Sequence, residues 1–268
     1  MKYFLDTEFT EGPQKEKFPI SLFRKNTPPT IDLISIGIVS EDGREYYAIS
    51  KDFNLKEAWN RYDLEEQSGD MRNVFPEGKK VYWIRENVLK SIWRELLKIY
   101  ELTNDVYSNK QADIFIQNVD AGYFDKCFSF KSLKSLFKLY GKTNKQIAEE
   151  IKKFCFDEVL IAKYEGRLVG YMDNVRGNPE FYAYYADYDW VVFCWLFGKM
   201  MDLPKGFPMY CKDLKQLFDQ KEDWLRIPTA MQHMDLKQHT HYPKQENEHS
   251  AIDDARWNKK LYDFLKSI

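Results

Sequence analysis

IDLISIGIVSEDGREYYAIS, residues 31–50, is the stretch that decides the fold class. Its first half is rich in β-branched residues and predicts a buried strand over 31–40. The acidic residues and glycine at 41–43 are typical of a tight turn, and 44–50 predicts a returning strand. YFLDTEF, residues 3–9, predicts another strand before this hairpin. We therefore expect a three-stranded antiparallel meander at the start of the chain.

The remainder of the chain alternates predicted helices with one further strand, over residues 181–186. Helices are predicted over six segments, residues 88–100, 132–140, 144–155, 190–201, 211–218 and 251–265. In the first and third of these, apolar residues recur at helical spacing. Asn144 is placed to cap the third of these helices. This order predicts an α/β fold in which helices flank a mixed sheet.

The composition indicates a globular protein with a packed core. Hydrophobic residues make up 44% of the 268 residues, which excludes global disorder. The net charge of -2 gives no strongly basic signature of nucleic-acid binding, so a nucleic-acid partner must be argued from a site. Four widely spaced cysteines without a CxxC pair argue against a disulfide framework or a zinc ribbon. Since no signal peptide or long apolar run is visible, we expect a cytoplasmic protein without a membrane partner, folded as a single domain over residues 1–268.

Two acidic residues stand at the end of the first predicted strand. Asp6 and Glu8 are two residues apart, so their side chains point to the same face of the strand. Two adjacent carboxylates repel each other, and a divalent cation with a preference for oxygen ligands, such as Mg²⁺ or Mn²⁺, removes that repulsion. The alternative is a solvated strand end, which is common for an isolated D-x-E pair.

Two further groups of polar residues interrupt apolar sequence. Asp187 and Asp189 separate an aromatic strand from an apolar helix, at the kind of strand end where α/β proteins bind ligands. The alternative is a pair of acids that favours the start of a helix. His249 precedes the last helix, Asp254 lies in its first turns, and the neighbouring Asp253 is expected to face solvent. Taken alone, these last residues fit a surface histidine near helix-capping acids.

Together, the motifs occur along the chain in the order D-x-E, Y-D and H-x4-D. This ordered set resembles the DEDD exonuclease superfamily, in the branch whose last motif carries a histidine. The matching residues are Asp6-Thr7-Glu8, Tyr188-Asp189 and His249 through Asp254. The chain is also similar to ribonuclease AS, a bacterial exoribonuclease family associated with polyadenylate. That similarity covers residues 1–10, 31–63, 180–220 and 247–266.

Three segments have no counterpart in that family and are interpreted as insertions, at about 11–30, 102–143 and 157–179. The first is charged and carries four prolines, which predicts a loop. The third is expected to contain an added hairpin over 159–171, turning at Glu165 and Gly166.

The resemblance implies a ribonuclease H-like fold, a homodimer and a 3′-5′ exoribonuclease. Such an enzyme hydrolyses single-stranded RNA from its 3′ end to nucleoside 5′-monophosphates, with adenylate-rich RNA as a candidate substrate. It uses two Mg²⁺ ions, for which Mn²⁺ can substitute. The resemblance assigns one ion to Asp6, Glu8 and Asp254, and the second to Asp6 with Asp189. It makes His249 the general base, a task for which an imidazole with a pKa near ~6.5 is suited.

Three residues beside these motifs are candidates for contact with the substrate. Phe9 and Trp190 each follow a catalytic motif, and an aromatic ring can stack on a base. In a chain with 16% aromatic residues, both also fit a position in the core. Thr7 lies between the two acids of the first motif.

Two other functions remain open from the sequence. A proofreading-type 3′-5′ DNA exonuclease would share every catalytic residue and would differ in recognition of the 2′-hydroxyl. A catalytically silent nucleic-acid-binding module has no need for four carboxylates and a histidine in this order.

Overall fold

The computed structural model describes residues 1–14, 19–23, 25–65, 79–102, 127–156, 163–164, 167–168, 177–225 and 235–268. The chain divides into two compact units, which are described separately. The first unit comprises Met1–Phe9, Leu33–Ser50 and Lys142–Ile268, and the second comprises Thr10–Asp32 and Lys51–Gly141. The single domain expected from the sequence stays a prediction.

A five-stranded mixed sheet, in the order β3-β2-β1-β8-β9, is the centre of the fold. Its strands are β1 (Lys2–Gly12), β2 (Thr30–Ser40), β3 (Glu45–Ile49), β8 (Glu180–Ala183) and β9 (Lys212–Asp213). β2 pairs with β3 antiparallel, whereas β8 pairs with both β1 and β9 in parallel. The predicted α/β class with a mixed sheet flanked by helices is confirmed, and it is consistent with a ribonuclease H-like fold.

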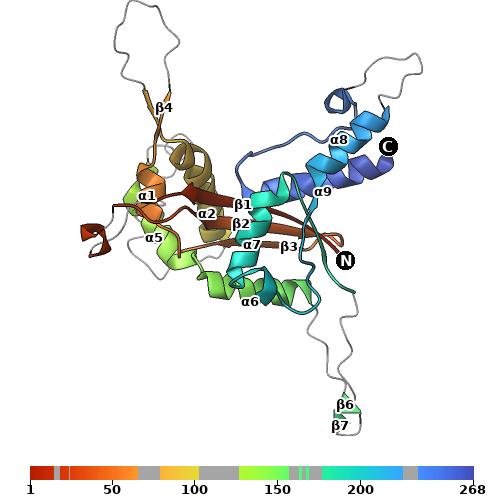
Figure 1. Cartoon of the computed structure of the whole chain (residues 1–268), viewed down its shortest axis with the longest axis horizontal. Helices are drawn as coiled ribbons and strands as arrows, with labels where there is room; N and C mark the ends of the chain where they lie inside the picture. Colours follow the sequence, from red (N-terminus) through yellow and green to blue (C-terminus); the bar gives the residue numbers. More distant parts are fainter. Residues whose placement is uncertain are drawn as a thin grey trace, which may run out of the picture. The chain divides into compact units, whose positions relative to one another are not determined.

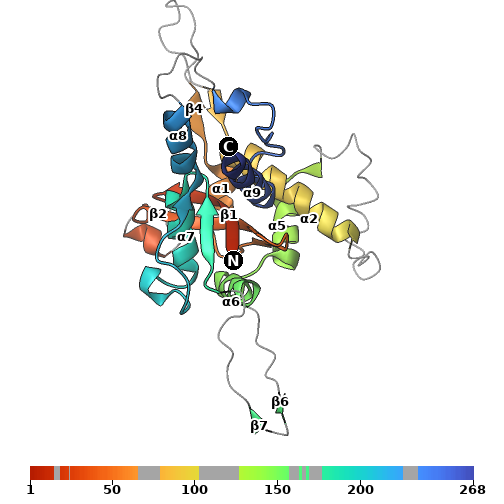
Figure 2. The same cartoon turned by 90° about the vertical axis from the view of Figure 1, so that its right-hand side faces the viewer.

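Four helices of the first unit pack on or beside this sheet. They are α6 (Asn144–Cys155), α7 (Ala186–Leu196), α8 (Leu214–Leu225) and α9 (Ala251–Ser267). Both α6 and α9 contact β3, and Figures 1 and 2 show them on opposite sides of the sheet. α7 contacts β8 and β9, and α8 packs on α9. None of the helices in the described part of the chain has the length and hydropathy required to cross a membrane.

The strands are central because both of their faces are apolar. Tyr3, Phe4 and Leu5 follow one another along β1 and are all buried, as expected for a strand covered on both sides. Gly37 on β2 lets α9 begin directly against the sheet, because a Cβ at this position would lie 2.2 Å from the carbonyl oxygen of Ala251. Glycine at this position therefore brings the first turn of α9 close to β1 and β2.

The second unit is built from short strands and helices. Those in its described residues are η1 (Ile20–Leu22), α1 (Leu55–Asn60), β4 (Asp63–Glu65), β5 (Lys79–Val81), η2 (Ile84–Leu89), α2 (Lys90–Leu102) and α5 (Phe130–Tyr140). β4 and β5 form an antiparallel pair, and α2 contacts both η2 and α5. The helices predicted over 88–100 and 132–140 are thereby confirmed.

Several predicted boundaries were wrong. β8 ends at Ala183 and α7 begins at Ala186, four residues before the predicted start. The helix predicted over 211–218 is preceded by the short strand β9 and begins at Leu214. Thr143 rather than Asn144 caps α6, in a reciprocal pair of hydrogen bonds with Gln146.

The insertions are described only in part. β6 (Lys163–Tyr164) and β7 (Arg167–Leu168) form an antiparallel pair, which confirms the hairpin of the third insertion. The remaining residues of 157–176, and residues 103–126 of the second insertion, lie outside the described residues. In the first insertion β1 continues to Gly12, and the Gln14 backbone N–H donates to the Thr27 hydroxyl at 3.0 Å.

Candidate active site

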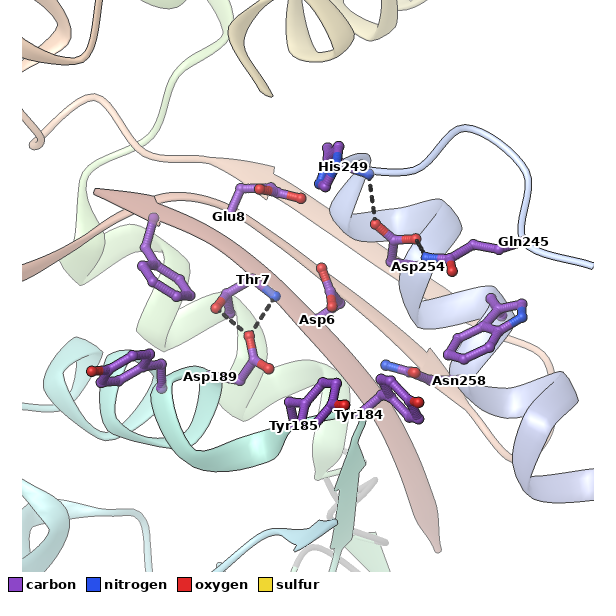
Figure 3. A pocket seen from close by; sticks show the side chains of 13 residues that line it. Asp6, Thr7, Glu8, Tyr184, Tyr185, Asp189, Gln245, His249, Asp254 and Asn258 are labelled. Atoms are coloured by element: carbon purple, nitrogen blue, oxygen red, sulfur yellow. Dashed lines mark hydrogen bonds between the residues drawn. The ribbon is translucent and has the colours of Figure 1, made fainter. Parts of the chain in front are cut away.

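A cavity of about 330 Å³ opens where β1, α7 and α9 converge, and all of its lining belongs to the first unit (Figure 3). This volume is close to that of the smallest ligand pockets. The cavity is lined by Asp6, Thr7, Glu8, Phe9, Tyr184, Tyr185, Tyr188, Asp189, Gln245, His249, Asp254, Trp257 and Asn258. All five residues predicted to be catalytic are therefore gathered around one cavity.

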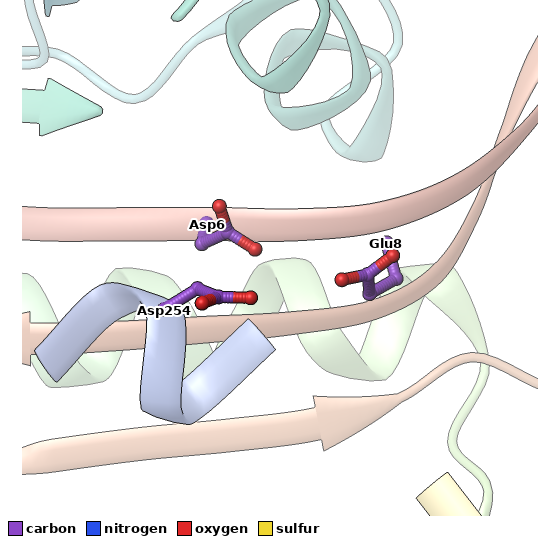
Figure 4. A group of neighbouring side chains, drawn as sticks. All are labelled: Asp6, Glu8 and Asp254. Carbon is purple, nitrogen blue, oxygen red and sulfur yellow. The ribbon is translucent and has the colours of Figure 1, made fainter. Parts of the chain in front are cut away.

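Three carboxylates from two elements converge in this cavity. Asp6 and Glu8 lie on the same face of β1, and Asp254 faces them from the first turns of α9 (Figure 4). Each offers one oxygen, and these oxygens all lie within 4.8 Å of one another. Glu8 and Asp254 are buried. This arrangement can hold a metal ion that prefers oxygen ligands.

The fourth carboxylate is held in place by β1. Asp189 is buried on α7, and its Oδ1 accepts hydrogen bonds from the Thr7 backbone N–H at 2.9 Å and the Thr7 hydroxyl at 2.5 Å. Thr7, predicted to contact substrate, thus has both of its donors on Asp189. Asp187 is exposed on α7, so the helix separates two acids that the sequence left ambiguous.

The loop before α9 is tied to Asp254. The carboxylate oxygens of Asp254 accept hydrogen bonds from the Gln245 side-chain amide at 2.6 Å and from the His249 backbone N–H at 2.9 Å. His249 has a φ of 66°, in the left-handed region that non-glycine residues rarely adopt. Such strain persists where the surrounding structure enforces it, commonly at functional sites. These contacts keep the half-buried His249 on the wall of the cavity.

The four carboxylates have raised pKa values. Burial raises the pKa of Asp6 well above its usual range, and the charges of Asp189, Glu8 and Asp254 raise it further. Burial, followed by the charges of Asp254 and Asp189, raises the pKa of Glu8 to about 8. Burial raises the pKa of Asp189 to about 7 despite the two hydrogen bonds from Thr7. Burial also raises the pKa of Asp254. The cluster therefore concentrates negative charge that a divalent cation would stabilise.

Without divalent metal ions, we expect the free energy of unfolding to decrease as the pH rises from about 5 to about 8. The pKa of Glu8 is about 8 in the folded protein against an ordinary value of 4.5, so the folded state binds more protons in this interval and loses stability as they dissociate. One pKa unit corresponds to about 1.4 kcal/mol. The midpoint of thermal unfolding in chelator should fall by roughly 5 °C or more over this range.

This expectation has an internal control. Glu8→Gln should show a smaller decrease with pH, because one of the titrating groups is gone. Adding Mg²⁺ should raise the unfolding midpoint of the wild type more at pH 8 than at pH 5. Equal pH dependence in the two proteins would show that Glu8 titrates normally in the folded state.

The two predicted aromatic contacts have different positions. Phe9 lines the cavity and packs edge-to-face on Tyr188, with ring centroids 5.7 Å apart. Trp190 is buried, stacks on Phe193 at 4.9 Å, and donates its indole N–H to the Met209 carbonyl at 3.2 Å. Trp190 thus belongs to the core and is not part of the cavity wall, so of the two rings only Phe9 can meet a ligand there.

Sequence reasoning missed several residues of the cavity. Gln245 and Asn258 lie near the last motif in sequence, but neither belongs to a pattern that predicts their side-chain contacts. Asn258 is buried on α9 and donates to the Leu5 carbonyl at 2.9 Å, which joins α9 to β1. Tyr184 and Tyr185 lie directly after β8, and the rule that ligands bind at the carboxyl ends of parallel strands could have identified them.

Two curated proteins are similar to this chain over its whole length. Both are named 3′-5′ exoribonuclease and come from Mycobacterium tuberculosis, one from strain CDC 1551 / Oshkosh and one from strain ATCC 25618 / H37Rv. Each is 24% identical over 267 residues, which is 100% of this chain and 94% of the relative. No protein-family model matches the chain.

Proposed function

We propose that this protein is a magnesium-dependent 3′-5′ exoribonuclease of the DEDD type that resembles ribonuclease AS. The observation that carries the proposal is the cluster of Asp6, Glu8 and Asp254 oxygens within 4.8 Å, beside the buried Asp189. The relatives named 3′-5′ exoribonuclease span the whole chain, which supports the same activity here.

The donor set fits two Mg²⁺ ions, or Mn²⁺ in their place. All four side chains offer carboxylate oxygens, the ligands that these cations prefer, and their raised pKa values reflect negative charge gathered in a buried place. Asp6, Glu8 and Asp254 would hold one ion, and Asp6 with Asp189 the second. When bound, the pair of ions supplies charge that stabilises the attacking and leaving oxygens of a phosphodiester.

The protein's own groups position these ligands and move the proton. Thr7 fixes Asp189 through two hydrogen bonds, and Gln245 with the His249 backbone fixes Asp254. A neutral imidazole of His249 accepts the proton of the attacking water on a ring nitrogen, as a general base. Phe9 offers a ring on which the 3′-terminal base stacks, and adenine, with its large ring system, suits such a contact.

A DNA exonuclease of the proofreading type is the second candidate, since it would use the same residues. Matched RNA and DNA oligonucleotides, labelled at the 5′ end and incubated with Mg²⁺ or with chelator, separate the two. We expect RNA to be shortened stepwise from the 3′ end in Mg²⁺, polyadenylate to be preferred among RNA homopolymers, and DNA to be degraded much more slowly. Faster hydrolysis of DNA would establish the alternative, and binding without hydrolysis would indicate a silent module.

Asp189→Ala should reduce hydrolysis at least about 10²-fold more than Asp187→Ala. Asp189 is buried beside the other carboxylates, whereas Asp187 is exposed on the same helix. Steady-state rates of the two purified variants on one RNA substrate test this ranking. If Asp187→Ala were the more damaging, the second motif would be misassigned.

A homodimer is also part of the proposal, on the basis of the family resemblance. The mass in solution, measured by light scattering, should be twice the 32.1 kDa of the chain. A mass of one chain at micromolar concentration would contradict it.

A further inference from the structure

Tyr185 combines exposure, strain and proximity to the carboxylates. Its side chain lines the cavity although the residue is 63% exposed. Its backbone has φ 57° and ψ 52°, the left-handed conformation that a tyrosine rarely adopts. Exposed tyrosines do not need such a conformation for packing, and strain of this kind concentrates at functional sites.

The strained turn is held by a carboxylate from the next strand. Asp213, at the end of β9, accepts the backbone N–H groups of Tyr185 and Ala186, both at 3.3 Å. It also accepts the Lys215 backbone N–H at 2.6 Å. Tyr185 gives α7 no side-chain cap, so Asp213 takes the place of the usual capping residue.

A row of aromatic rings supports Tyr185 from behind. Its ring centroid lies 4.7 Å from that of the half-buried Tyr184, at an interplanar angle of 70°. Tyr184 in turn contacts the buried Trp257 at 5.1 Å and 84°. The ring of Tyr185 thus lies against Tyr184 on the protein side (Figure 3). More than half of the residue is exposed to solvent.

The position along α7 relates this ring to the reacting groups. Tyr185 directly precedes α7, Asp189 lies in the first turn of that helix, and both line the same cavity. The Phe9–Tyr188 pair is a second aromatic group on the same cavity. A phosphate at the carboxylates is flanked by two nucleotides, and the cavity thus offers one aromatic group for each base.

We propose that Tyr185 is the platform on which the penultimate base of the RNA stacks, and that Asp213 is the positioning residue that holds it there. This inference rests on the proposed function and adds a second base site to it. Stacking on a ring tolerates any base, so the contact selects a single-stranded 3′ end of at least two nucleotides rather than a particular sequence.

The test uses variants that should weaken RNA binding without lowering thermal stability. Tyr185→Gly removes the ring and the strain together, because glycine adopts positive φ freely. We expect an unchanged or higher midpoint of thermal unfolding, and about a tenfold higher KM for an RNA oligonucleotide with a much smaller change in kcat. Tyr185→Phe keeps the ring and should restore the KM. Tyr185→Asn, which also tolerates this conformation, repeats the test if the glycine variant folds poorly. Tyr210→Ala is the matched control, since Tyr210 is 62% exposed and is not among the cavity residues.

The substrate provides the second arm of the test. An RNA that lacks only its penultimate base should have a KM about tenfold higher than intact RNA with the wild type, and an equal KM with Tyr185→Gly. Asp213→Asn alone should raise the KM for RNA. Combined with Tyr185→Gly, it should raise the KM no further than Tyr185→Gly does.

The outcomes separate this inference from the function on which it rests. An active wild type whose KM is unaffected by Tyr185→Gly overturns the base platform alone. Additive effects of Asp213→Asn and Tyr185→Gly overturn the positioning role of Asp213. A wild type that hydrolyses no RNA overturns the proposed function and this inference together.

Discussion

Asp6→Asn should reduce hydrolysis of RNA in Mg²⁺ by roughly 10³-fold, equivalent to about 4 kcal/mol of lost transition-state stabilisation. Asp6 is the residue proposed to contact both ions, and an amide cannot supply the charge that its carboxylate does. The same substitution removes a repulsive charge from among Asp189, Glu8 and Asp254. We therefore expect the variant to fold, with an unfolding midpoint in chelator at least as high as that of the wild type.

The two measurements together make the prediction specific. A variant that lost activity because it unfolded would also lose thermal stability, whereas a lost metal ligand leaves stability intact or raises it. Asp187→Asn is the control, because it removes an exposed charge from the neighbourhood of the same cavity. Wild-type turnover in purified Asp6→Asn would exclude this cluster as the catalytic site.

His249→Ala should lower the single-turnover rate by about 10²–10⁴-fold, the usual range for loss of a general base. Its affinity for RNA should change little, because the proposed base contacts come from aromatic residues elsewhere in the cavity. The rate of the wild type should fall at acidic pH as a base must be neutral to accept a proton, and this acidic limb should be lost or altered in the variant.

The contribution of the imidazole can be separated from that of the loop. The His249 backbone N–H holds Asp254, and His249→Ala preserves this N–H. His249→Gly also preserves this N–H and favours the left-handed backbone of the wild type. Because it too lacks the imidazole, it should be as inactive as the alanine variant. A wild-type single-turnover rate in either variant would show that another group takes the proton.

The first and third motifs were predictable because their geometry is local. Asp6 and Glu8 share a face through the two-residue period of a strand, and Asp254 lies one turn into a helix whose apolar pattern is clear. Their convergence depends on Gly37, which allows α9 to begin against β2. No local sequence pattern predicts that α9 will pack on β2. The convergence of Asp254 with Asp6 and Glu8 could therefore be predicted only from the order of the motifs.

The element boundary at the second motif was mispredicted because its helix has no local start signal. Tyr185 stands at the position where Ser, Thr, Asp or Asn is usual, and the capping carboxylate is Asp213, 28 residues later. The sequence therefore placed Asp187 and Asp189 between a predicted strand and a predicted helix, whereas α7 already begins at Ala186 and separates them. β9 was missed for a related reason, since a strand of two residues carries no period.

The aromatic residues show where composition is ambiguous. Phe9 and Trp190 each follow an acidic motif, yet one lines the cavity and the other is buried against Phe193. On the strand Phe9 shares a face with Thr7 and packs on Tyr188 of α7 at the edge of the cavity, whereas on the helix Trp190 is turned by about 100° from Asp189 into the core. Once the helix start is known, this outcome follows.

The most direct test of the central claim compares linear RNA with circular RNA of the same sequence, in Mg²⁺ and in chelator. The wild type should release nucleoside 5′-monophosphates from the 3′ end of the linear RNA only in Mg²⁺, and should leave the circle intact because it has no 3′ end. Asp6→Asn should be inactive on both. Cleavage of the circle at the rate of the linear RNA, or hydrolysis undiminished by chelator, would contradict a metal-dependent 3′-5′ exoribonuclease.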